Sequence, residues 1–319
     1  MPGEFSLIDR YFAGLTPPRD DVRLGIGDDA ALLAMPAGQD LVLATDTLVA
    51  GVHFPGATAP EAVGHKALAV NLSDLAAMGA EPAWATLALT LPEADAAWLA
   101  GFAAGFGALA AAHGVALVGG DTTRGALTVT VTLAGRVPSG EALTRAGARP
   151  GDGIWVTGSL GDAGMALALL EAGKPVPEAL RRRLDRPEPR LAAGRALRGL
   201  ATAAIDVSDG LAADLGHLLQ ASGVGARVAA ERLPRSAALR AAQADEAEGL
   251  RLALGAGDDY ELCFTLPPAA EAAMNTRMAA IGWPVTWIGE IEAEPGLRLI
   301  DADGRERPAP GGFDHFGGP

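Results

Sequence analysis

Apolar and polar positions follow two patterns along this chain: short runs typical of β-strands, and longer helical stretches rich in Ala and Leu. Their alternation is typical of an α/β or α+β protein. In the first half the pattern predicts helices over residues 60–78 and 93–112, and strands over 30–34, 41–45, 83–91, 115–118 and 127–137. In the second half, units of strand, turn and helix are expected at 154–173 and 203–220, with further strands over 263–266, 285–288 and 297–300.

The helix expected within 203–220 has the clearest burial pattern. Its apolar positions Leu211, Leu215, Leu218 and Leu219 follow the i, i+4, i+7, i+8 spacing of one buried helix face. By contrast, "RRRLDRPEPR" at 181–190 is interpreted as an exposed connection interrupted by proline. Gly, Pro and charged residues gather in "SGEALTRAGARPGDG" at 139–153, which marks a domain boundary. We therefore expect two domains, 1–138 and 149–319.

Composition limits the classes of binding partner and the cellular compartment that we expect. The net charge of −14 over 319 residues argues against nucleic-acid binding, which needs clustered Lys and Arg. The N-terminal stretch lacks the pattern of a secretion signal, and Cys263 is the single cysteine, so we expect a cytoplasmic protein. The longest uncharged stretch, at 96–120, is predicted to be a buried helix followed by a strand rather than a membrane span.

Aspartates beside apolar runs are the candidate functional residues. They occur in turns with Gly, Ser or Thr near predicted element ends, where a single Asp usually serves as a turn or helix-cap residue. A cluster of carboxylates needs cations to neutralise it, and scattered single aspartates suit Mg²⁺ held together with substrate phosphates. The histidines are dispersed, which argues against zinc. The set comprises Asp28, Asp29, Asp46, Asp74, Asp121, Asp206, Asp209, Asp258 and Asp259.

Groups that can bind phosphate are few. "GGDTTRG" at 119–125 combines glycine backbone, hydroxyls, Asp121 and Arg124, and is interpreted as one phosphate and metal turn after a strand. Arg145 and Lys66 are further cations, for each of which a surface role is the simpler interpretation. "GSLGDAG" at 158–164 resembles a phosphate loop, but tight packing between strand and helix explains its glycines equally well.

Several motifs in fixed order point to one family. They are "GEFSLI", "GIGDDAALL", "TDTLVAGVHF", "KALAVNLSDLAAMGAEP", "GGDTTRG", "DVSDGLAADL", "GDDYELCF" and "GFDHF", and they span nearly the whole chain. On these motifs the chain resembles the thiamine-monophosphate kinase family, within the superfamily that includes aminoimidazole ribonucleotide synthetase. The resemblance implies a two-domain fold of that superfamily, with mixed sheets flanked by helices. It also implies ATP- and magnesium-dependent phosphorylation of thiamine monophosphate to thiamine diphosphate by a homodimer.

The resemblance also assigns site residues and domain roles. Domain 1–138 would bind metal and ATP and form the dimer, and domain 149–319 would complete the substrate site. Metal binding would fall to Asp28, Asp29, Thr45, Asp46, Asp74, Asp121, Asp206 and Asp209. ATP would contact Gly120, Asp121, Arg145 and Ser208, and thiamine phosphate would contact His53, Asp258 and Phe313. Asp74, Asp209 and Arg145 are the expected catalytic residues.

Some positions depart from the family pattern. Ala44 stands where a hydroxyl residue is expected beside Thr45, so one metal would use a backbone carbonyl or water instead. Asp258 replaces a glutamate, and Phe313 replaces another aromatic ring. Two alternatives stay open: another ATP-using synthetase of the superfamily, and a non-catalytic regulator that binds nucleotide or metal. For the kinase, a phosphate nucleophile needs no dedicated base, so we expect direct transfer with metals and Arg145 as electrostatic agents.

Overall fold

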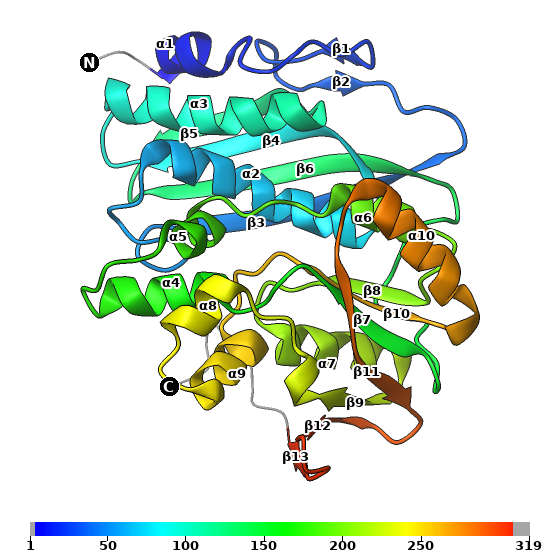
Figure 1. Ribbon diagram of the computed structural model, residues 1–319. Coiled ribbons are helices and arrows are strands. Elements are labelled where there is room, and N and C mark those ends of the chain that lie inside the picture. Colours follow the sequence, from blue (N-terminus) through cyan, green and yellow to red (C-terminus); the bar gives the residue numbers. More distant parts are fainter. Residues whose placement is uncertain (1–3, 309–319) are drawn as a thin grey trace. The chain divides into compact units, whose positions relative to one another are not determined.

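The computed structural model describes residues 4–308, which divide into two units (Figure 1). One unit contains the chain up to Leu75 together with Ala80–Gly140, and the other contains Ala76–Gly79 and the chain from Glu141 onward. The units are called N-terminal and C-terminal below. Each has its own sheet and its own helices, so the mixed α/β class expected from the sequence is confirmed.

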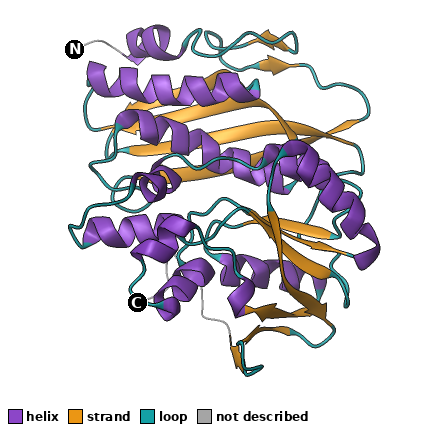
Figure 2. Ribbon diagram, in the orientation of Figure 1, coloured by secondary structure: helices purple, strands orange, loops and turns teal. Residues whose placement is uncertain are grey.

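The N-terminal unit is built on a four-stranded sheet in the order β3-β6-β4-β5. Its strands are β3 (Gln39–Val49), β4 (Glu81–Leu91), β5 (Ala116–Arg124) and β6 (Thr128–Pro138); β4 and β5 are parallel, and the other pairs are antiparallel. Helices α2 (Pro60–Ala77) and α3 (Ala96–His113) lie over one face of this sheet (Figure 2). Before them come α1 (Glu4–Leu7), η1 (Ile8–Phe12) and a hairpin of β1 (Val22–Leu24) and β2 (Leu32–Leu33).

Helices α2 and α3 approach each other through glycines. A β-carbon on Gly105 would lie 1.9 Å from the carbonyl oxygen of Glu61, and one on Gly64 would lie 2.1 Å from that of Phe102. Within residues 4–308, α3 is the one helix long and apolar enough to cross a membrane by length and composition alone. Leu99, Phe102 and Phe106 on it are fully buried. The predicted buried helix followed by a strand is therefore present as α3 and β5.

The C-terminal unit is built on a seven-stranded sheet in the order β13-β12-β9-β11-β7-β10-β8. The neighbours are antiparallel except β12 and β9. The strands are β7 (Gly153–Thr157), β8 (Ala203–Asp206), β9 (Gly225–Ala229), β10 (Leu262–Leu266), β11 (Val285–Glu292), β12 (Gly296–Ile300) and β13 (Glu306–Pro308).

Helices and short 3-10 turns surround this second sheet. They are α4 (Asp162–Glu171), α5 (Glu178–Asp185), α6 (Leu191–Leu197), α7 (Leu211–Ser222), η2 (Ala230–Arg232), α8 (Ala237–Ala242), α9 (Glu246–Gly255), η3 (Pro268–Ala270) and α10 (Glu271–Ile281). The four leucines of α7 that were predicted to share a buried face are at most 4% exposed. The hydrophobic spacing therefore gave both the element and its buried side correctly.

The sequence interpretation of two segments is wrong. Residues 181–190 are not an exposed connection, because α5 covers Glu178–Asp185 and Arg190 is only 4% exposed. The segment 119–125 is not a turn, because β5 continues to Arg124. In both cases local composition suggested the wrong structure. Arg183 and Arg190 bind a buried carboxylate, and Gly119 and Gly120 lie within a strand that pairs with β4.

Candidate active site

Two loops of the C-terminal unit run side by side and place several predicted site residues together. Asp206 ends β8, and the chain then bonds to the loop before β10 through main-chain hydrogen bonds. The amide of Val207 donates to the carbonyl of Glu261 (2.8 Å), that of Tyr260 to Val207 (2.8 Å), and that of Asp258 to Ser208 (2.8 Å). Ser208 and Asp209 therefore lie beside Asp258.

The loop that carries Asp258 has an uncommon backbone. Asp258 and Tyr260 are the non-glycine residues with positive φ in the described chain, at 62° and 51°. Such left-handed geometry costs about 1–2 kcal/mol per residue outside glycine. The Tyr260 hydroxyl donates to Oδ1 of Asp258 at 2.9 Å, which links the two strained residues. Strain of this kind is concentrated at functional sites and persists only where surrounding contacts hold it.

Asp214 holds the loop that contains Ser208 and Asp209, and the sequence analysis did not identify it as a site residue. Its Oδ2 accepts the backbone amides of Ser208 (2.9 Å) and Asp209 (3.0 Å), although the residue lies on α7 and is only 3% exposed. Burial, with the nearby charges of Asp206 and Asp209, raises the pKa of Asp214 to about 7. The signal in the sequence was an acidic residue on the buried face of α7, where hydrophobic spacing predicts an apolar one.

A buried ion-pair cluster lies beneath the Asp258 loop. Oε1 and Oε2 of Glu261 accept a bidentate pair of hydrogen bonds from Arg190, both at 2.6 Å. Glu261 also accepts from Arg183 (2.8 Å) and from the Thr157 hydroxyl (2.6 Å). The Arg190 guanidinium stacks 3.9 Å from the centre of the Trp283 ring. Glu261 is fully buried, so these contacts supply the countercharge that a carboxylate needs there.

The neighbouring carboxylate, Asp259, is held from a different side. Its Oδ1 accepts the backbone amide of Gly161 at 2.8 Å, at the start of α4. The residue is 1% exposed, and burial raises the pKa of Asp259 well above its ordinary value. Asp259 thus joins the loop to the helix start and is a structural residue in this unit.

In the N-terminal unit, the predicted metal residues lie on strands, a helix and a loop. Thr45 and Asp46 are adjacent in β3, so their side chains point to opposite faces of the sheet. The Thr45 hydroxyl lies 2.9 Å from that of Thr132, whereas Asp46 shares its face with Ala44. The two side chains therefore cannot bind one ion together. The aspartates of the strands were expected in turns, and this placement corrects that expectation.

The remaining predicted residues of this unit are spread over its elements. Asp121 and Gly120 lie in β5; Gly120 has φ 153°, and a β-carbon on it would lie 1.9 Å from the carbonyl oxygen of Leu87. Asp74 lies in α2 and is half-buried. Asp28 and Asp29 lie in the exposed loop between β1 and β2, where the Asp29 amide donates to Asp28.

His53 is tied to neighbouring elements by hydrogen bonds. Nδ1 of His53 accepts the amide of Val49 at 3.0 Å, and its carbonyl accepts from Nζ of Lys66 at 3.2 Å. Lys66 is 2% exposed, so it is not the surface cation that the sequence suggested. In the C-terminal unit Arg145 is exposed, and its carbonyl accepts from Ser222. Phe313 lies outside the described residues.

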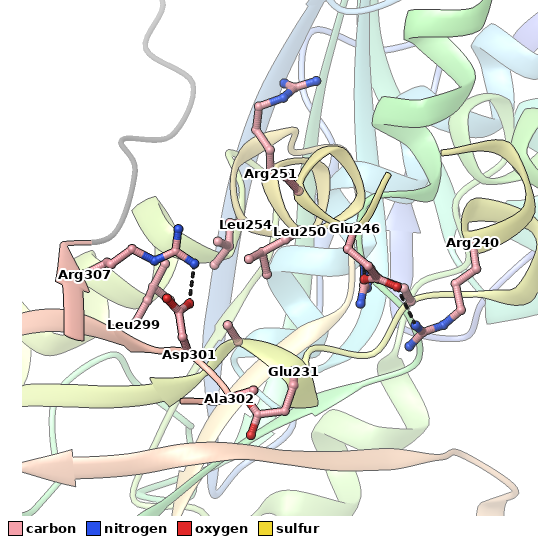
Figure 3. Close-up of a pocket in the computed structure, with 13 residues that line it drawn as sticks. Glu231, Arg240, Glu246, Leu250, Arg251, Leu254, Leu299, Asp301, Ala302 and Arg307 are labelled. Carbon is pink, nitrogen blue, oxygen red and sulfur yellow. Dashed lines mark hydrogen bonds and ion pairs between the residues drawn. The ribbon is translucent and has the colours of Figure 1, made fainter. Parts of the chain in front are cut away.

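The C-terminal unit also contains a cavity of about 950 Å³ (Figure 3). It lies among η2, α9 and β12, and its walls combine Leu250, Leu254 and Leu299 with charged side chains. Arg235 there pairs with Glu246 at 2.6 Å, and Arg307 pairs with Asp301. None of the predicted site residues within 4–308 lines this cavity, so its size alone does not make it the reaction site.

Comparison with known proteins decides the family. Residues 27–137 match the model for the N-terminal domain of AIR synthase related proteins, and residues 149–302 match the model for the C-terminal domain. The thiamine-monophosphate kinase of Salmonella typhimurium is 50% identical over 324 residues, covering 99% of both chains. This chain belongs to the thiamine-monophosphate kinase family. That membership confirms the resemblance drawn from the motifs.

Solved structures of the thiamine-monophosphate kinase family match the fold. The enzyme from Stenotrophomonas maltophilia K279a is 50% identical, with a TM-score of 0.88 over 96% of this chain and 98% of that chain. The structure of AaThiL complexed with AMPPCP and TMP is 35% identical, with a TM-score of 0.77 over 98% and 97% of the two chains. The two-domain fold of the aminoimidazole ribonucleotide synthetase type is therefore confirmed.

The side chains fit magnesium only in part. Within the part of the chain that the structure describes, no three His, Cys, Asp or Glu side chains are arranged around one ion. The pair Asp206 and Asp209 is nevertheless close enough to Asp214 to raise its pKa, so negative charge accumulates there. Mg²⁺ is typically bound by one or two carboxylates with water and substrate phosphates completing its shell. A pair of aspartates at the Ser208 loop suits that mode in a thiamine-monophosphate kinase.

Proposed function

We propose that this chain catalyses ATP-dependent phosphorylation of thiamine monophosphate, giving thiamine diphosphate and ADP. The observation that carries the proposal is full-length identity of 50% to a thiamine-monophosphate kinase. The relative complexed with AMPPCP, an ATP analogue, and TMP supports both substrates. The enzyme is then a phosphotransferase whose acceptor is itself a phosphate group.

The residues suit direct transfer. A phosphomonoester carries about −1.5 to −2 charge at pH 7, so the acceptor oxygen is already a nucleophile and no general base is required. The difficulty is repulsion between two anions. We propose that Arg145 bears part of this charge, and that the Asp258 loop positions the thiamine phosphate. Asp214 would hold the Ser208 loop in place by accepting the amides of Ser208 and Asp209. His53 and Phe313 would contribute to the same substrate.

Magnesium supplies charge neutralisation and alignment of the phosphates when it is bound. In the C-terminal unit Asp206 and Asp209 would hold it. In the N-terminal unit the proposed ligands are Asp28, Asp29, Asp46, Asp74 and Asp121, with Thr45 contributing its carbonyl oxygen because its hydroxyl faces away from Asp46. Gly120, beside Asp121 in β5, would contact ATP through its backbone.

One assay tests the function. Purified protein is mixed with Mg-ATP and thiamine monophosphate, and thiamine diphosphate and ADP are quantified by chromatography. Free thiamine replaces the monophosphate as the control acceptor, and EDTA removes the metal. We expect product from the monophosphate alone, and only with magnesium. Absence of thiamine diphosphate, or its formation from free thiamine, would refute the proposal. With ATP labelled in the γ-phosphate and no acceptor, label retained on the protein would contradict direct transfer.

We also propose a homodimer formed by domain 1–138 in the cytoplasm. Support comes from β3, an edge strand of the four-stranded sheet on which Leu41 and Leu43 are 51% and 62% exposed. Exposed leucines in a row on a sheet edge are typical of an interface. Light scattering of the wild type and of Leu43→Asp tests this: we expect a dimer for the first and a monomer for the second, and a monomeric wild type would refute it.

A further inference from the structure

The Asp258 loop is attached to helix α5 by one arginine. The NH2 nitrogen of Arg183 donates to the backbone carbonyl of Asp259 at 2.9 Å and to Oε1 of Glu261 at 2.8 Å. The side chain is 17% exposed, and it comes from a segment that the sequence suggested was a free connection. A single nitrogen therefore joins the backbone of the loop to the buried carboxylate beneath it.

Arg183 and Arg190 have different roles in this cluster. Arg190 gives Glu261 a bidentate pair of hydrogen bonds and stacks on Trp283, so it supplies the main countercharge. Within the part of the chain that the structure describes, Arg183 is the one of these two arginines that bonds to the loop backbone. Removal of Arg183 therefore leaves Glu261 paired, while it frees the carbonyl of Asp259.

That carbonyl lies between the two strained residues of the loop. Asp258 and Tyr260 both have left-handed backbones, which non-glycine residues leave readily unless contacts hold them. Asp259 is fixed on both sides, its side chain by the Gly161 amide and its carbonyl by Arg183. Because Asp258 precedes this fixed residue and accepts from the Tyr260 hydroxyl, its carboxylate direction depends on the same anchor.

We propose that Arg183 is a positioning residue for the substrate: through the Asp259 carbonyl it sets the direction in which Asp258 meets the thiamine phosphate. This inference rests on the proposed function and on the substrate role of Asp258. Arg183 itself contacts no reacting atom. Its effect should therefore appear in binding of the phosphate acceptor and leave the nucleotide unaffected.

Steady-state kinetics with each substrate varied in turn test the proposal. We expect Arg183→Met to raise KM for thiamine monophosphate about tenfold, with kcat and KM for ATP changed by less than about twofold. Arg183→Lys keeps the charge but shortens the reach, so it should restore part of the affinity. Arg182→Met on the exposed side of α5 is the matched control and should behave as the wild type. An unchanged KM for the acceptor in Arg183→Met would overturn the proposal.

A second measurement needs no substrate. The chain has only two tyrosines, Tyr11 and Tyr260, so incorporation of 3-fluorotyrosine gives one fluorine reporter in each unit. We expect the Tyr260 resonance, assigned with Tyr11→Phe, to shift or broaden in Arg183→Met and Arg183→Lys while that of Tyr11 stays unchanged. An unaltered Tyr260 resonance would also overturn the proposal. If the wild type makes no thiamine diphosphate, the function fails instead, and this spectrum still reports on the anchor.

Discussion

Gly158 lies so close to Glu261 that a β-carbon on it would stand 2.1 Å from Oε1 of that carboxylate. Gly158 opens the sequence "GSLGDAG", whose glycines suit either a phosphate loop or tight packing. The other two glycines are equally confined: a β-carbon on Gly161 would lie 2.8 Å from the backbone nitrogen of Ala253, and one on Gly164 would lie 2.2 Å from the β-carbon of Ala256. Packing therefore accounts for all three positions.

Gly158→Ala should destabilise the protein by about 3 kcal/mol, because the new methyl group displaces a buried carboxylate from its arginine partners. Gly173→Ala is the matched control. It has nearly the same positive φ, 63° against 56°, but nothing lies within 4 Å of the added carbon. It should cost only the backbone term, about 1 kcal/mol. Urea unfolding of both variants measures the difference, and equal losses would contradict the packing role of Gly158.

Gly105→Ala should also destabilise the protein, by about 2 kcal/mol or more, because α3 would have to move away from the Glu61 carbonyl of α2. Gly216→Ala in α7 is the opposite case. No atom lies within 4 Å of its added carbon, so the better helix propensity of alanine should stabilise the protein by about 0.5–1 kcal/mol. Thermal unfolding compares the two, and a stabilised Gly105→Ala would show that the helices do not meet closely.

Asp214 should act through hydrogen-bond acceptance. Asp214→Asn keeps an oxygen that can accept the amides of Ser208 and Asp209, so we expect turnover within about threefold of the wild type. Asp214→Ala leaves both amides without that acceptor and should lower turnover about tenfold or more by loosening the loop. Single-turnover kinetics of both variants, with folding checked by circular dichroism, separates these effects. Equal activity of the two would exclude the role.

Asp74→Asn should affect chemistry far more than folding. It removes one negative charge from the proposed metal site on α2, so kcat should fall about a hundredfold or more while the unfolding temperature changes little. Asp95→Ala is a control that should affect stability rather than chemistry, because Asp95 caps α3 by accepting the amides of Ala97 and Trp98. It should cost about 1 kcal/mol of stability and leave kcat intact. Wild-type turnover of Asp74→Asn at limiting magnesium would remove Asp74 from the site.

Periodic segments were predictable, since hydrophobic spacing directly reports which face of an element is buried. The face of α7 with Leu211 and Leu215 was found this way, and the helices predicted at 60–78 and 93–112 appear as α2 and α3. The family motifs likewise marked the loops at Ser208 and Asp258. Short-range pattern and turn chemistry are sufficient for these features because each is determined by neighbours in the sequence.

Long-range pairing was not predictable. Arg183 and Arg190 appeared to be surface charges because their partner, Glu261, lies more than 70 residues away. Asp214 was overlooked although its partners, Ser208 and Asp209, are only six and five residues away, because its acceptor role depends on how the chain turns between β8 and α7. Strand β5 also extended beyond its apolar part because pairing with β4 supplies hydrogen bonds that composition does not reveal. The buried pairing of Arg183 and Arg190 with Glu261 therefore became visible only with the tertiary structure.

Asp21 fastens the segment before β1 to the sheet of the N-terminal unit. Its carboxylate accepts from Arg19 at 2.6 and 2.9 Å and from Nε1 of Trp84 in β4 at 3.0 Å. Arg136 in β6 lies 3.5 Å from the same group. Chiefly through the hydrogen bond from Arg19, these groups hold the pKa of Asp21 below its ordinary value.

The stability that Asp21 contributes should therefore depend on pH in one direction. A carboxylate with a lowered pKa in the folded state stabilises fully above its unfolded pKa of about 3.9 and loses that contribution as pH falls through the folded value. Asp21→Asn should cost roughly 1–3 kcal/mol at pH 7, because charge-assisted hydrogen bonds are lost. Urea unfolding should show the same gap to the wild type from pH 8 to pH 5 and a narrower gap below about pH 4. A gap that widens as the solution becomes acidic would mean that Asp21 is not held as the anion, and that the segment is fastened instead by packing of Val22 and Leu33 against the core cluster that includes Trp84.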